Sequence, residues 1–231
     1  MVLEEHHLNL LFERERTNKM DIAYSVITIV VCLLVGYAFG NISTAYFVGK
    51  IYGIDIRKEG SGNLGSTNAL RTLGIKAGVM TFLGDVTKTL VPILVLRYFV
   101  FAGDTEYGIW MAMWLGLGTV LGHNFPCWLH FKGGKGIAVT AAVVLSIAHW
   151  PLIVGGLLLF VVIVGLTRYV SLGSLFVAFY LPFNTIMWHR ESPYFIHMLL
   201  VSLLFTILAF VQHRTNIVRL VHGEERKLGQ K

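Results

Sequence analysis

The sequence predicts an all-α integral membrane protein with seven transmembrane helices. Hydrophobic residues make up 55% of the 231 residues and charged residues only 14%, whereas a soluble domain usually carries about 25% charged residues. Long runs of the chain lack any formal charge, and polar segments rich in glycine separate them. A soluble fold of this length cannot enclose so many long apolar runs, so we expect a bilayer to surround them.

The apolar runs cover residues 22–48, 75–100, 107–121, 137–167, 172–188 and 195–211. The fourth run contains no Asp, Glu, Lys or Arg. As one helix it would be about 46 Å long, against a hydrocarbon core of about 30 Å. We divide it at His149, Trp150 and Pro151, because a proline and an interfacial tryptophan are typical of a turn at the membrane surface. Seven spans result.

Residues 1–19 are polar and of mixed charge. They do not form a signal peptide, because no apolar stretch precedes a small-residue cleavage site. Met20 stands immediately before the first apolar run. One interpretation is that translation starts there and that residues 1–19 are a dispensable, non-native tail. The membrane domain then comprises residues 20–231.

The distribution of Lys and Arg predicts how the spans are oriented. Seven spans place the two ends of the chain on opposite sides, and most basic residues fall on the side of the C-terminal tail: Lys50, Arg57, Lys58, Arg71, Lys76, Lys132, Lys135, Arg168, Arg214, Arg219, Arg226, Lys227 and Lys231. The other side carries Arg97, Arg190 and the basic residues of the N-terminal tail. Because loops rich in Lys and Arg stay in the cytoplasm, we expect the N-terminus outside and the C-terminus inside.

This orientation places three polar segments, 53–74, 122–136 and 212–224, on one cytoplasmic face. The net charge of +6 then reflects contact with anionic lipid head groups. No run of basic residues is interleaved with exposed aromatic residues, so we expect no nucleic-acid partner. The convergence of the three segments carries most of the functional argument.

Residues 60–71 read GSGNLGSTNALR, a composition typical of an anion-binding loop. Glycines let successive backbone N–H groups turn toward one point, and Arg71 adds a planar cation that suits phosphate. Neutral donors come from Ser61, Asn63, Ser66, Thr67 and Asn68. The alternative is a flexible loop followed by a helix capped by Ser66 or Thr67. A glycine-rich motif alone does not decide between them.

Residues 122–136 read GHNFPCWLHFKGGKG and lead directly into an apolar run. Glycines and a lysine at a helix N-terminus form an anion site. The segment is not a nucleotide P-loop, because the GxxxxGK spacing and the Ser or Thr after the lysine are absent. The alternative is that Lys132 and Lys135 only mark the edge of a span.

The third segment contains His213 and Asn216, which are three residues apart and share one face of a helix. Both can bond a polar substrate held above the bilayer. The alternative is an amphipathic interfacial helix whose basic residues contact lipid phosphates.

Asp85 and Lys88 are also three residues apart, but they lie inside a span. Charges there are costly, so we expect the two to pair with each other or to face a polar cavity. The two cysteines are far apart and no HExxH motif occurs. We therefore expect neither a structural metal nor a disulfide.

Together the three segments resemble the bacterial acyl-phosphate:glycerol-3-phosphate acyltransferase (PlsY) family. They are similar to its signatures GSGNxGxTNxxR, GHxFPxxxxFKGGKG and HxxNIxRLxxGxE, in the same order. The resemblance covers nearly the whole chain after Met20. It departs at Thr89, where the family often has glycine, and in the charged leader at 1–19, which family members usually lack.

The resemblance implies seven transmembrane helices in the bacterial cytoplasmic membrane, with short cytoplasmic loops forming the active site. It implies transfer of a fatty acyl group from acyl phosphate to the 1-hydroxyl of sn-glycerol 3-phosphate, without coenzyme A. The products are 1-acyl-glycerol 3-phosphate and inorganic phosphate, in the first step of phospholipid synthesis. We expect no cofactor and no obligate protein partner; the other contacts are membrane lipids.

The same resemblance assigns roles to residues of the three motifs. The expected catalytic residues are Ser61, Asn63, Arg71, Lys135, His213 and Asn216. The expected substrate-binding residues are Gly60, Gly62, Thr67, Asn68, Gly133, Gly134 and Gly136. We interpret Glu224 as structural.

Positioning and charge stabilisation are the expected means of catalysis, because phosphate is already a good leaving group. The hydroxyl proton goes to a substrate phosphate oxygen, to His213 or to water. Ser61 is expected to donate a hydrogen bond rather than to be acylated.

Other classes of protein fit the sequence less well. A transporter of organic phosphates would spread polar residues through both leaflets or show an inverted repeat, and we find neither. An acyl-CoA enzyme of the HxxxxD type is disfavoured, because no His is followed by Asp five residues later. A membrane scaffold would not need three motifs rich in glycine and basic residues.

Overall fold

The computed structural model describes residues 22–230, and every regular element among them is helical. The first helix covers residues 22–40. The α-helices after it are α2 (Thr44–Ile51), α3 (Ser66–Leu73), α4 (Ile75–Val95), α5 (Thr105–Asn124), α6 (Ile137–Ile147), α7 (Trp150–Thr167), α8 (Val170–Val177), α9 (Tyr180–Trp188), α10 (Phe195–Gln212) and α11 (Arg214–Val221). Single turns of 3-10 helix lie at Ile56–Lys58 and Cys127–Leu129, and a π-helical turn follows α4 at Leu96–Val100. The interpretation of residues 1–19 concerns a part of the chain outside the described residues.

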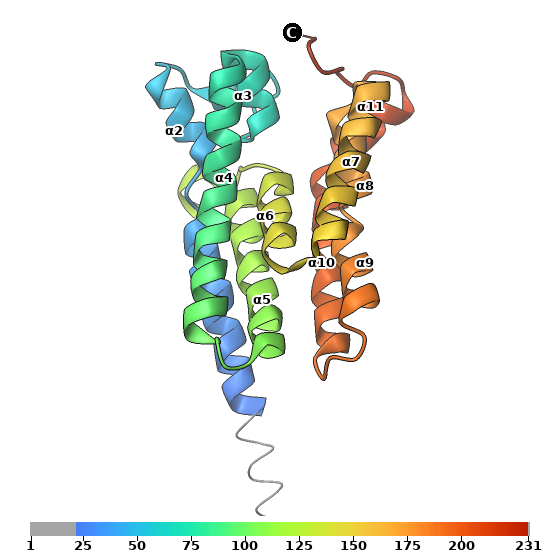
Figure 1. The fold of residues 1–231 in the computed structure, drawn as a ribbon. Helices are drawn as coiled ribbons and strands as arrows, with labels where there is room; N and C mark the ends of the chain where they lie inside the picture. The colour runs from blue at the N-terminus through green and yellow to red at the C-terminus, as the bar shows by residue number, and fades with distance from the viewer. Residues whose placement is uncertain (1–21, 231) are drawn as a thin grey trace, which may run out of the picture.

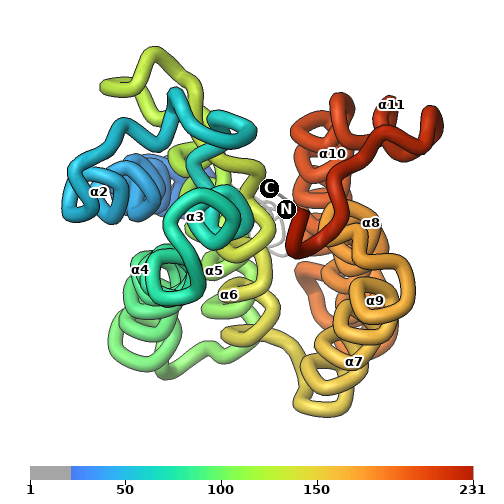
Figure 2. The backbone as a smooth tube through the Cα atoms, turned by 90° about the horizontal axis from the view of Figure 1, so that it is seen from above, coloured from blue at the N-terminus to red at the C-terminus, as the bar shows by residue number. Residues whose placement is uncertain are grey.

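The helices form two groups that stand side by side (Figures 1 and 2). The first helix and α2 to α6 make one group, and α7 to α11 make the other. The chain between α6 and α7 joins them, and α5 packs against α10 across the boundary. Helices α2, α3 and α11 lie toward the same end of the molecule, which we call the polar end.

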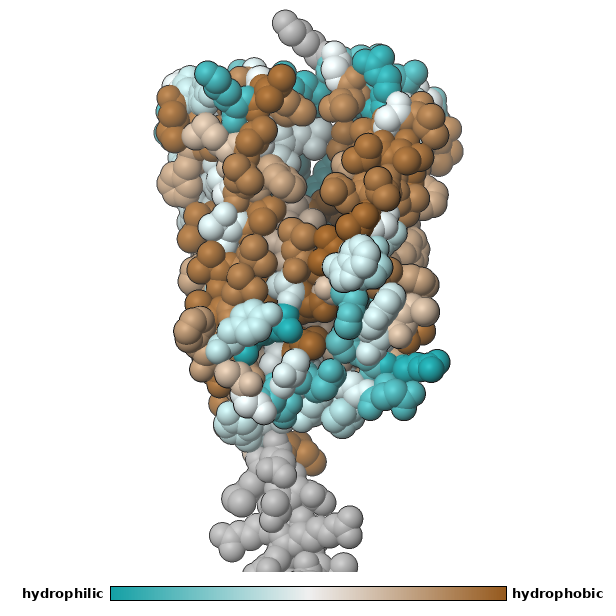
Figure 3. All heavy atoms as spheres, viewed as in Figure 1, coloured by the Kyte–Doolittle hydropathy of each residue, from teal (hydrophilic) through white to brown (hydrophobic). Residues whose placement is uncertain are grey.

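The side of the molecule is largely apolar, and polar residues gather at its two ends (Figure 3). Helix α7 illustrates the pattern, because only Leu152, Gly156 and Val164 of its residues are buried, while its Leu166 is 82% exposed. An exposed helix that is apolar on every side requires a lipid environment. The prediction of a membrane protein is therefore supported by the surface as well as by composition.

Among the described residues, five helical segments are long and apolar enough to cross a membrane: Ile22–Ile51, Ile75–Val100, Trp150–Thr167, Val170–Trp188 and Phe195–Gln212. Helix α6 lies on the side of the first group that faces the second group (Figure 2). Most of α5 is buried by its neighbours. The all-helical membrane fold is thus confirmed, while the count of seven spans stays a prediction.

The predicted division at residues 149–151 is confirmed, since α6 ends at Ile147 and α7 starts at Trp150 with Pro151 in its first turn. Two other spans are less regular than the hydrophobic pattern indicates. The expected span 22–48 breaks at residues 41–43, and the expected span 172–188 breaks between α8 and α9. Hydrophobicity alone does not predict where these helices break, because the residues at the breaks can also lie within a membrane span.

The first helix and α5 pack at close range through glycines on both. The glycines recur at four-residue spacing: Gly36 and Gly40 on the first helix, Gly118 and Gly122 on α5. A Cβ atom on Gly36 would lie 2.0 Å from the carbonyl oxygen of Leu115. Small residues at this spacing allow two membrane helices to approach closely. The contact holds α5, whose last turn carries part of the polar segment 122–136, firmly in the first group.

Candidate functional site

The three predicted polar segments meet at one cavity of about 370 Å³ toward the polar end. The surface between the two helix groups is hollowed near this end in Figure 3. The cavity is lined by Ser61, Gly62, Asn63, Asn124, Phe125, Phe131, Lys132, Gly133, Gly134, Lys135, Gln212, Arg214, Thr215 and Arg219. Both helix groups therefore contribute walls, and the predicted convergence of distant segments is observed.

The first segment forms a glycine loop held from behind by Asn68. The Asn68 Oδ1 accepts a 2.9 Å hydrogen bond from the backbone N–H of Ser61, and its Nδ2 donates to the carbonyl oxygen of Glu59 at 3.1 Å. Gly60 and Gly62 have φ values of 61° and 69°, which favour glycine. Ser61 is exposed at the tip of the loop and lines the cavity.

Helix α3, which follows this loop, starts without a side-chain cap. Gly65 is its N-cap residue, so neither Ser66 nor Thr67 caps it in the way the alternative interpretation proposed. The first turn of such a helix leaves backbone N–H groups without helical partners.

The second segment is folded back onto the end of α5. The N–H groups of Gly133 and Gly134 donate to the carbonyl oxygens of Asn124 and His123 at 3.1 and 3.0 Å. A Cβ atom on Gly134 would lie 2.0 Å from His123 Nε2, so no larger residue fits without displacement. The two glycines thus allow the loop to lie directly on the α5 terminus, beside the cavity.

The third segment is joined to the second by a direct contact. The Lys135 ammonium donates to Oδ1 of Asn216, and the Nδ2 of Asn216 donates to Oε1 of Glu225 at 2.6 Å. Glu225 also accepts from Arg219 Nε at 2.8 Å and from the Ser171 hydroxyl at 2.8 Å. A chain of polar contacts therefore runs from Lys135, in the loop before α6 of the first group, to α8 and α11 of the second.

The acidic residue in this chain of contacts is Glu225, on which the final Glu of the signature HxxNIxRLxxGxE falls. Glu224, the residue interpreted from the sequence as structural, has an exposed side chain, whereas Glu225 makes the contacts. Burial raises the pKa of Glu225, but the bonds from Arg219, Asn216 and Ser171 outweigh it and lower that pKa. Gly223, with φ of 71°, turns the chain between α11 and these residues.

His213 is buried beside this network, with 3% of its surface exposed. Its Nδ1 donates to the carbonyl oxygen of Ala209 at 2.8 Å, which leaves Nε2 as the acceptor of a neutral ring. Burial lowers the pKa of His213 to about 4, so the ring is neutral near pH 7.

Positive charge is concentrated around the same cavity. Burial lowers the pKa of Lys135 to about 8, and the nearby cations Arg219 and Arg71 act in the same direction while Glu225 opposes them. Burial and the neighbouring Arg226 lower the pKa of Arg71. These cations lie close enough to repel one another, which is the electrostatic character expected of a site for anions.

Of the expected site residues, the cavity brings together Ser61, Gly62, Asn63, Gly133, Gly134 and Lys135. Asn216 contacts Lys135, and His213 lies between the cavity-lining Gln212 and Arg214. Gly60, Thr67, Asn68, Arg71 and Gly136 lie outside the lining. Arg71 is nonetheless coupled electrostatically to Lys135, while Asn68 shapes the loop.

Several lining residues were not expected from the sequence: Asn124, Phe125, Phe131, Gln212, Arg214, Thr215 and Arg219. Arg219 and Asn124 belong to the same polar segments as the expected residues. A search of those segments for every group that can bond an anion would have found Arg219. The same search would have included the Asn124 amide, but only the folded turn shows that this residue lines the cavity.

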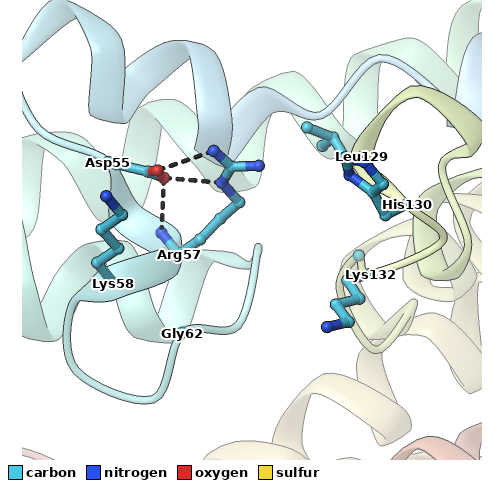
Figure 4. A pocket seen from close by; sticks show the side chains of 8 residues that line it. Asp55, Arg57, Lys58, Gly62, Leu129, His130 and Lys132 are labelled. Carbon is cyan, nitrogen blue, oxygen red and sulfur yellow. Dashed lines mark hydrogen bonds and ion pairs between the residues drawn. The ribbon is translucent and has the colours of Figure 1, made fainter.

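A second cavity, also of about 370 Å³, adjoins the first and shares Gly62, Lys132 and Gly133 with it. Figure 4 shows Asp55 and Arg57 joined on one side of it and Lys132 on the other. Arg57 donates from Nε and Nη2 to the two carboxylate oxygens, each at 2.8 Å. These bonds lower the pKa of Asp55 to about 2. The opening is basic overall and continues the positive surface of the polar end.

The intramembrane pair Asp85 and Lys88 belongs to a buried network at the end of α5. Their Oδ1 and Nζ atoms are 2.7 Å apart, and Lys88 Nζ is 3.0 Å from His123 Nδ1. The hydroxyl of Thr44 also donates to Asp85, at 3.0 Å. The expected pairing is confirmed. His123 links the pair to the glycine turn of the second segment, which the sequence did not predict.

Within residues 22–230, no group of three or more His, Cys, Asp or Glu side chains is placed to hold a metal ion. Thr89, at the position where the resembled family often has glycine, donates its hydroxyl to the carbonyl oxygen of Asp85 at 2.9 Å. Threonine at position 89 therefore fits within α4, because its hydroxyl bonds to the backbone of the same helix.

Comparison with known proteins shows which family the sequence matches. Residues 30–223 match the family model described as glycerol-3-phosphate acyltransferase. The glycerol-3-phosphate acyltransferase of Clostridioides difficile (strain 630) is 41% identical over 89% of this chain and 98% of its own length. That of Alkaliphilus metalliredigens (strain QYMF) is 44% identical over 86% of this chain and 95% of its own.

Solved structures show the same fold. The crystal structure of PlsY (YgiH), an integral membrane glycerol 3-phosphate acyltransferase, matches in its glycerol 3-phosphate form with a TM-score of 0.71 and 30% identity, covering 89% of this chain and 96% of that one. Its lysophosphatidic acid form matches with the same TM-score and 31% identity, covering 87% and 95%. The chain belongs to the glycerol-3-phosphate acyltransferase family of integral membrane proteins.

Proposed function

We propose that this protein transfers a fatty acyl group from acyl phosphate to the 1-hydroxyl of sn-glycerol 3-phosphate, giving 1-acyl-glycerol 3-phosphate and inorganic phosphate. The observation that carries the proposal is the cavity in which Ser61, Lys135 and Arg219, from three distant segments, face one small volume. Family membership supports glycerol 3-phosphate as the acceptor. The proposed donor rests on the resemblance of the three motifs to the acyl-phosphate-dependent family.

Two phosphorylated substrates need two sets of anion-binding groups. We assign Lys135, Arg71 and Asn216 to the phosphate of glycerol 3-phosphate, because they lie together around the third segment. We assign the glycine loop, with Gly60, Gly62 and Thr67, to the phosphate of the donor. The first-turn N–H groups of α3, which directly follows this loop, have no helical partners and can bind an anion.

The reaction forms a bond between the glycerol O1 and the acyl carbon and breaks the bond from that carbon to the phosphate oxygen. Phosphate leaves readily, so the site mainly positions the hydroxyl and stabilises the negative charge that develops. Ser61 and Asn63 line the cavity and supply neutral donors for this charge.

The hydroxyl proton passes, in our assignment, to an oxygen of the departing phosphate. The pKa of His213, lowered by burial to about 4, makes its ring a weak base. Phosphate titrates near pH 6 and is a stronger one. We assign His213 Nε2 to hold the hydroxyl by accepting its hydrogen bond before transfer. Neither a cofactor nor an obligate protein partner enters this scheme.

The proposed acyl donor explains why this enzyme is a membrane protein. Acyl phosphate carries a long apolar chain, and the apolar sides of the helices allow that chain to remain in lipid while its phosphate reaches the cavity. We propose seven spans, with α5 and α6 added to the five long ones, in the bacterial cytoplasmic membrane. We also propose that the polar end and the C-terminus lie in the cytoplasm and the N-terminus outside, because segments rich in Lys and Arg stay in the cytoplasm.

The direct test uses the purified protein with glycerol 3-phosphate and either palmitoyl phosphate or palmitoyl-CoA as donor. We expect product only with palmitoyl phosphate, with inorganic phosphate released in equal amount. Lys135→Ala should abolish turnover, while the matched variant Lys76→Ala, at an exposed lysine near the start of α4, should retain it. Turnover with palmitoyl-CoA alone would overturn the assigned donor.

A further inference from the structure

Asn124 is one of the residues that line the substrate cavity, and its buried side-chain amide has no hydrogen-bond partner among the described residues. It is the last residue of α5, and 2% of its surface is exposed. Its Oδ1 and Nδ2 are both buried and both unpaired, although the residue lines the cavity. A buried polar atom without a partner is costly and therefore uncommon in proteins.

The backbone around Asn124 keeps this side chain in place. The Asn124 carbonyl oxygen accepts from Gly133 N at 3.1 Å, and that of the preceding His123 accepts from Gly134 N at 3.0 Å. On its other side, a Cβ atom added to Gly136 would lie 3.0 Å from Asn124 Oδ1. The amide is thus enclosed between α5 and the start of α6, next to Lys135.

The donor and acceptor atoms of an amide determine which chemical groups can form hydrogen bonds with both of them. Its nitrogen only donates and its oxygen only accepts, so a single partner must both accept and donate. An ionised phosphate offers acceptors alone, and the amide oxygen would repel it. A hydroxyl group accepts one hydrogen bond and donates another, and so pairs with both ends of the amide.

Glycerol 3-phosphate carries two hydroxyl groups, at C1 and at C2. The C1 oxygen attacks the acyl carbon, and a hydrogen bond donated to that oxygen would withdraw the lone pair that forms the new bond. The C2 hydroxyl takes no part in the reaction, so it can accept from Nδ2 and donate to Oδ1 throughout. We propose that the Asn124 amide binds the C2 hydroxyl of glycerol 3-phosphate and makes the enzyme select for it. This inference depends on the proposed function in one respect only, namely that glycerol 3-phosphate is the acyl acceptor.

The experiment compares the binding of glycerol 3-phosphate with that of propane-1,3-diol monophosphate, which lacks only the C2 hydroxyl. Titration calorimetry on the purified wild-type protein, without any acyl donor, should show glycerol 3-phosphate bound about tenfold or more tightly, because the analogue leaves the amide unpaired. In Asn124→Ala the two ligands should bind nearly equally, through a loss of affinity for glycerol 3-phosphate alone. Asn124→Leu, which fills the same volume without polar atoms, should behave in the same way and guards against a folding defect in the alanine variant.

Asn184 provides the matched control. It lies on α9, is 1% exposed, and its amide atoms are also buried and unpaired, but it lines neither described cavity. Asn184→Ala should therefore retain the wild-type preference between the two ligands. If the Asn124 variants keep that preference, or lose affinity for both ligands equally, the inference is wrong. A wild-type protein that binds neither ligand would overturn the proposed function together with it.

Discussion

Lys88 and Asp85 form an ion pair inside the helix bundle, with 2.7 Å between the lysine Nζ and the carboxylate Oδ1. The same ammonium donates to the carbonyl oxygen of Ile42 at 2.7 Å and to that of Gly40 at 3.4 Å. These two carbonyls lie at the break between the first helix and α2. Because a helix break leaves backbone groups without partners in a membrane, Lys88 both neutralises Asp85 and stabilises the break.

Replacing Lys88 by Met should therefore destabilise the protein strongly. It leaves the Asp85 carboxylate without a counter-charge, and breaking a buried pair on one side costs roughly 3–5 kcal/mol. Thermal unfolding in detergent measures the loss. The double variant Asp85→Leu with Lys88→Met should recover part of it, because no buried charge remains. A single variant as stable as the wild type would contradict the account.

The pH dependence of kcat/KM should follow the ionisation of Lys135. This lysine is charged below its pKa of about 8 and neutral above it, and only the charged form attracts phosphate. The phosphate of the acceptor is fully ionised by then, with its second pKa near 6. We expect kcat/KM for glycerol 3-phosphate to fall about tenfold per pH unit above pH 8.

Lys135→Arg supplies the control for this profile, because arginine stays charged to far higher pH. Any residual activity of that variant should show no decline between pH 8 and pH 9.5. A decline that persists in the arginine variant would assign the ionisation to another group.

Glu225→Gln should lower activity far more than Glu224→Gln. The Glu225 carboxylate orients the amide of Asn216 and neutralises Arg219, and through Asn216 it reaches Lys135. Loss of its charge should reduce kcat/KM by about tenfold or more, since charge-assisted bonds are each worth roughly 1.5–3 kcal/mol. The two glutamates are sequence neighbours, so equal effects of the two substitutions would refute the assignment to Glu225.

Gly36→Ala should reduce stability, whereas Gly165→Ala should not. A Cβ atom at Gly36 would meet the Leu115 carbonyl oxygen at 2.0 Å, while a Cβ atom at Gly165, on the exposed face of α7, meets nothing within 4 Å. Overpacking of this kind costs typically 1–3 kcal/mol. Thermal unfolding of both variants in the same detergent compares them directly. Equal stability would mean that the first helix and α5 are not in close contact.

Hydrophobic runs and local motifs predicted the large-scale organisation well. The apolar runs mark most of the helices, and the three polar segments meet as expected around Lys135 and Asn216. Both signals depend on residue type over many positions. Signals that are spread over many residues do not depend on how any one side chain packs. They can therefore be recognised in a single sequence.

The features that the sequence did not predict depend on geometry at single residues. Glu225 is not such a feature, because the final Glu of the signature HxxNIxRLxxGxE falls on it when counted from His213. The break at residues 41–43, however, is stabilised by Lys88, more than 40 positions away. Contacts of this kind combine distant parts of the chain, and no local pattern of residues encodes them.

The division of the helices into two groups has a consequence for how the protein can be assembled. The covalent link between the groups is the short stretch around His149 that separates α6 from α7. Membrane helices insert individually and associate afterwards. Two separate polypeptides, cut at this stretch, should therefore insert on their own, and enzymatic activity would appear only when both are co-expressed.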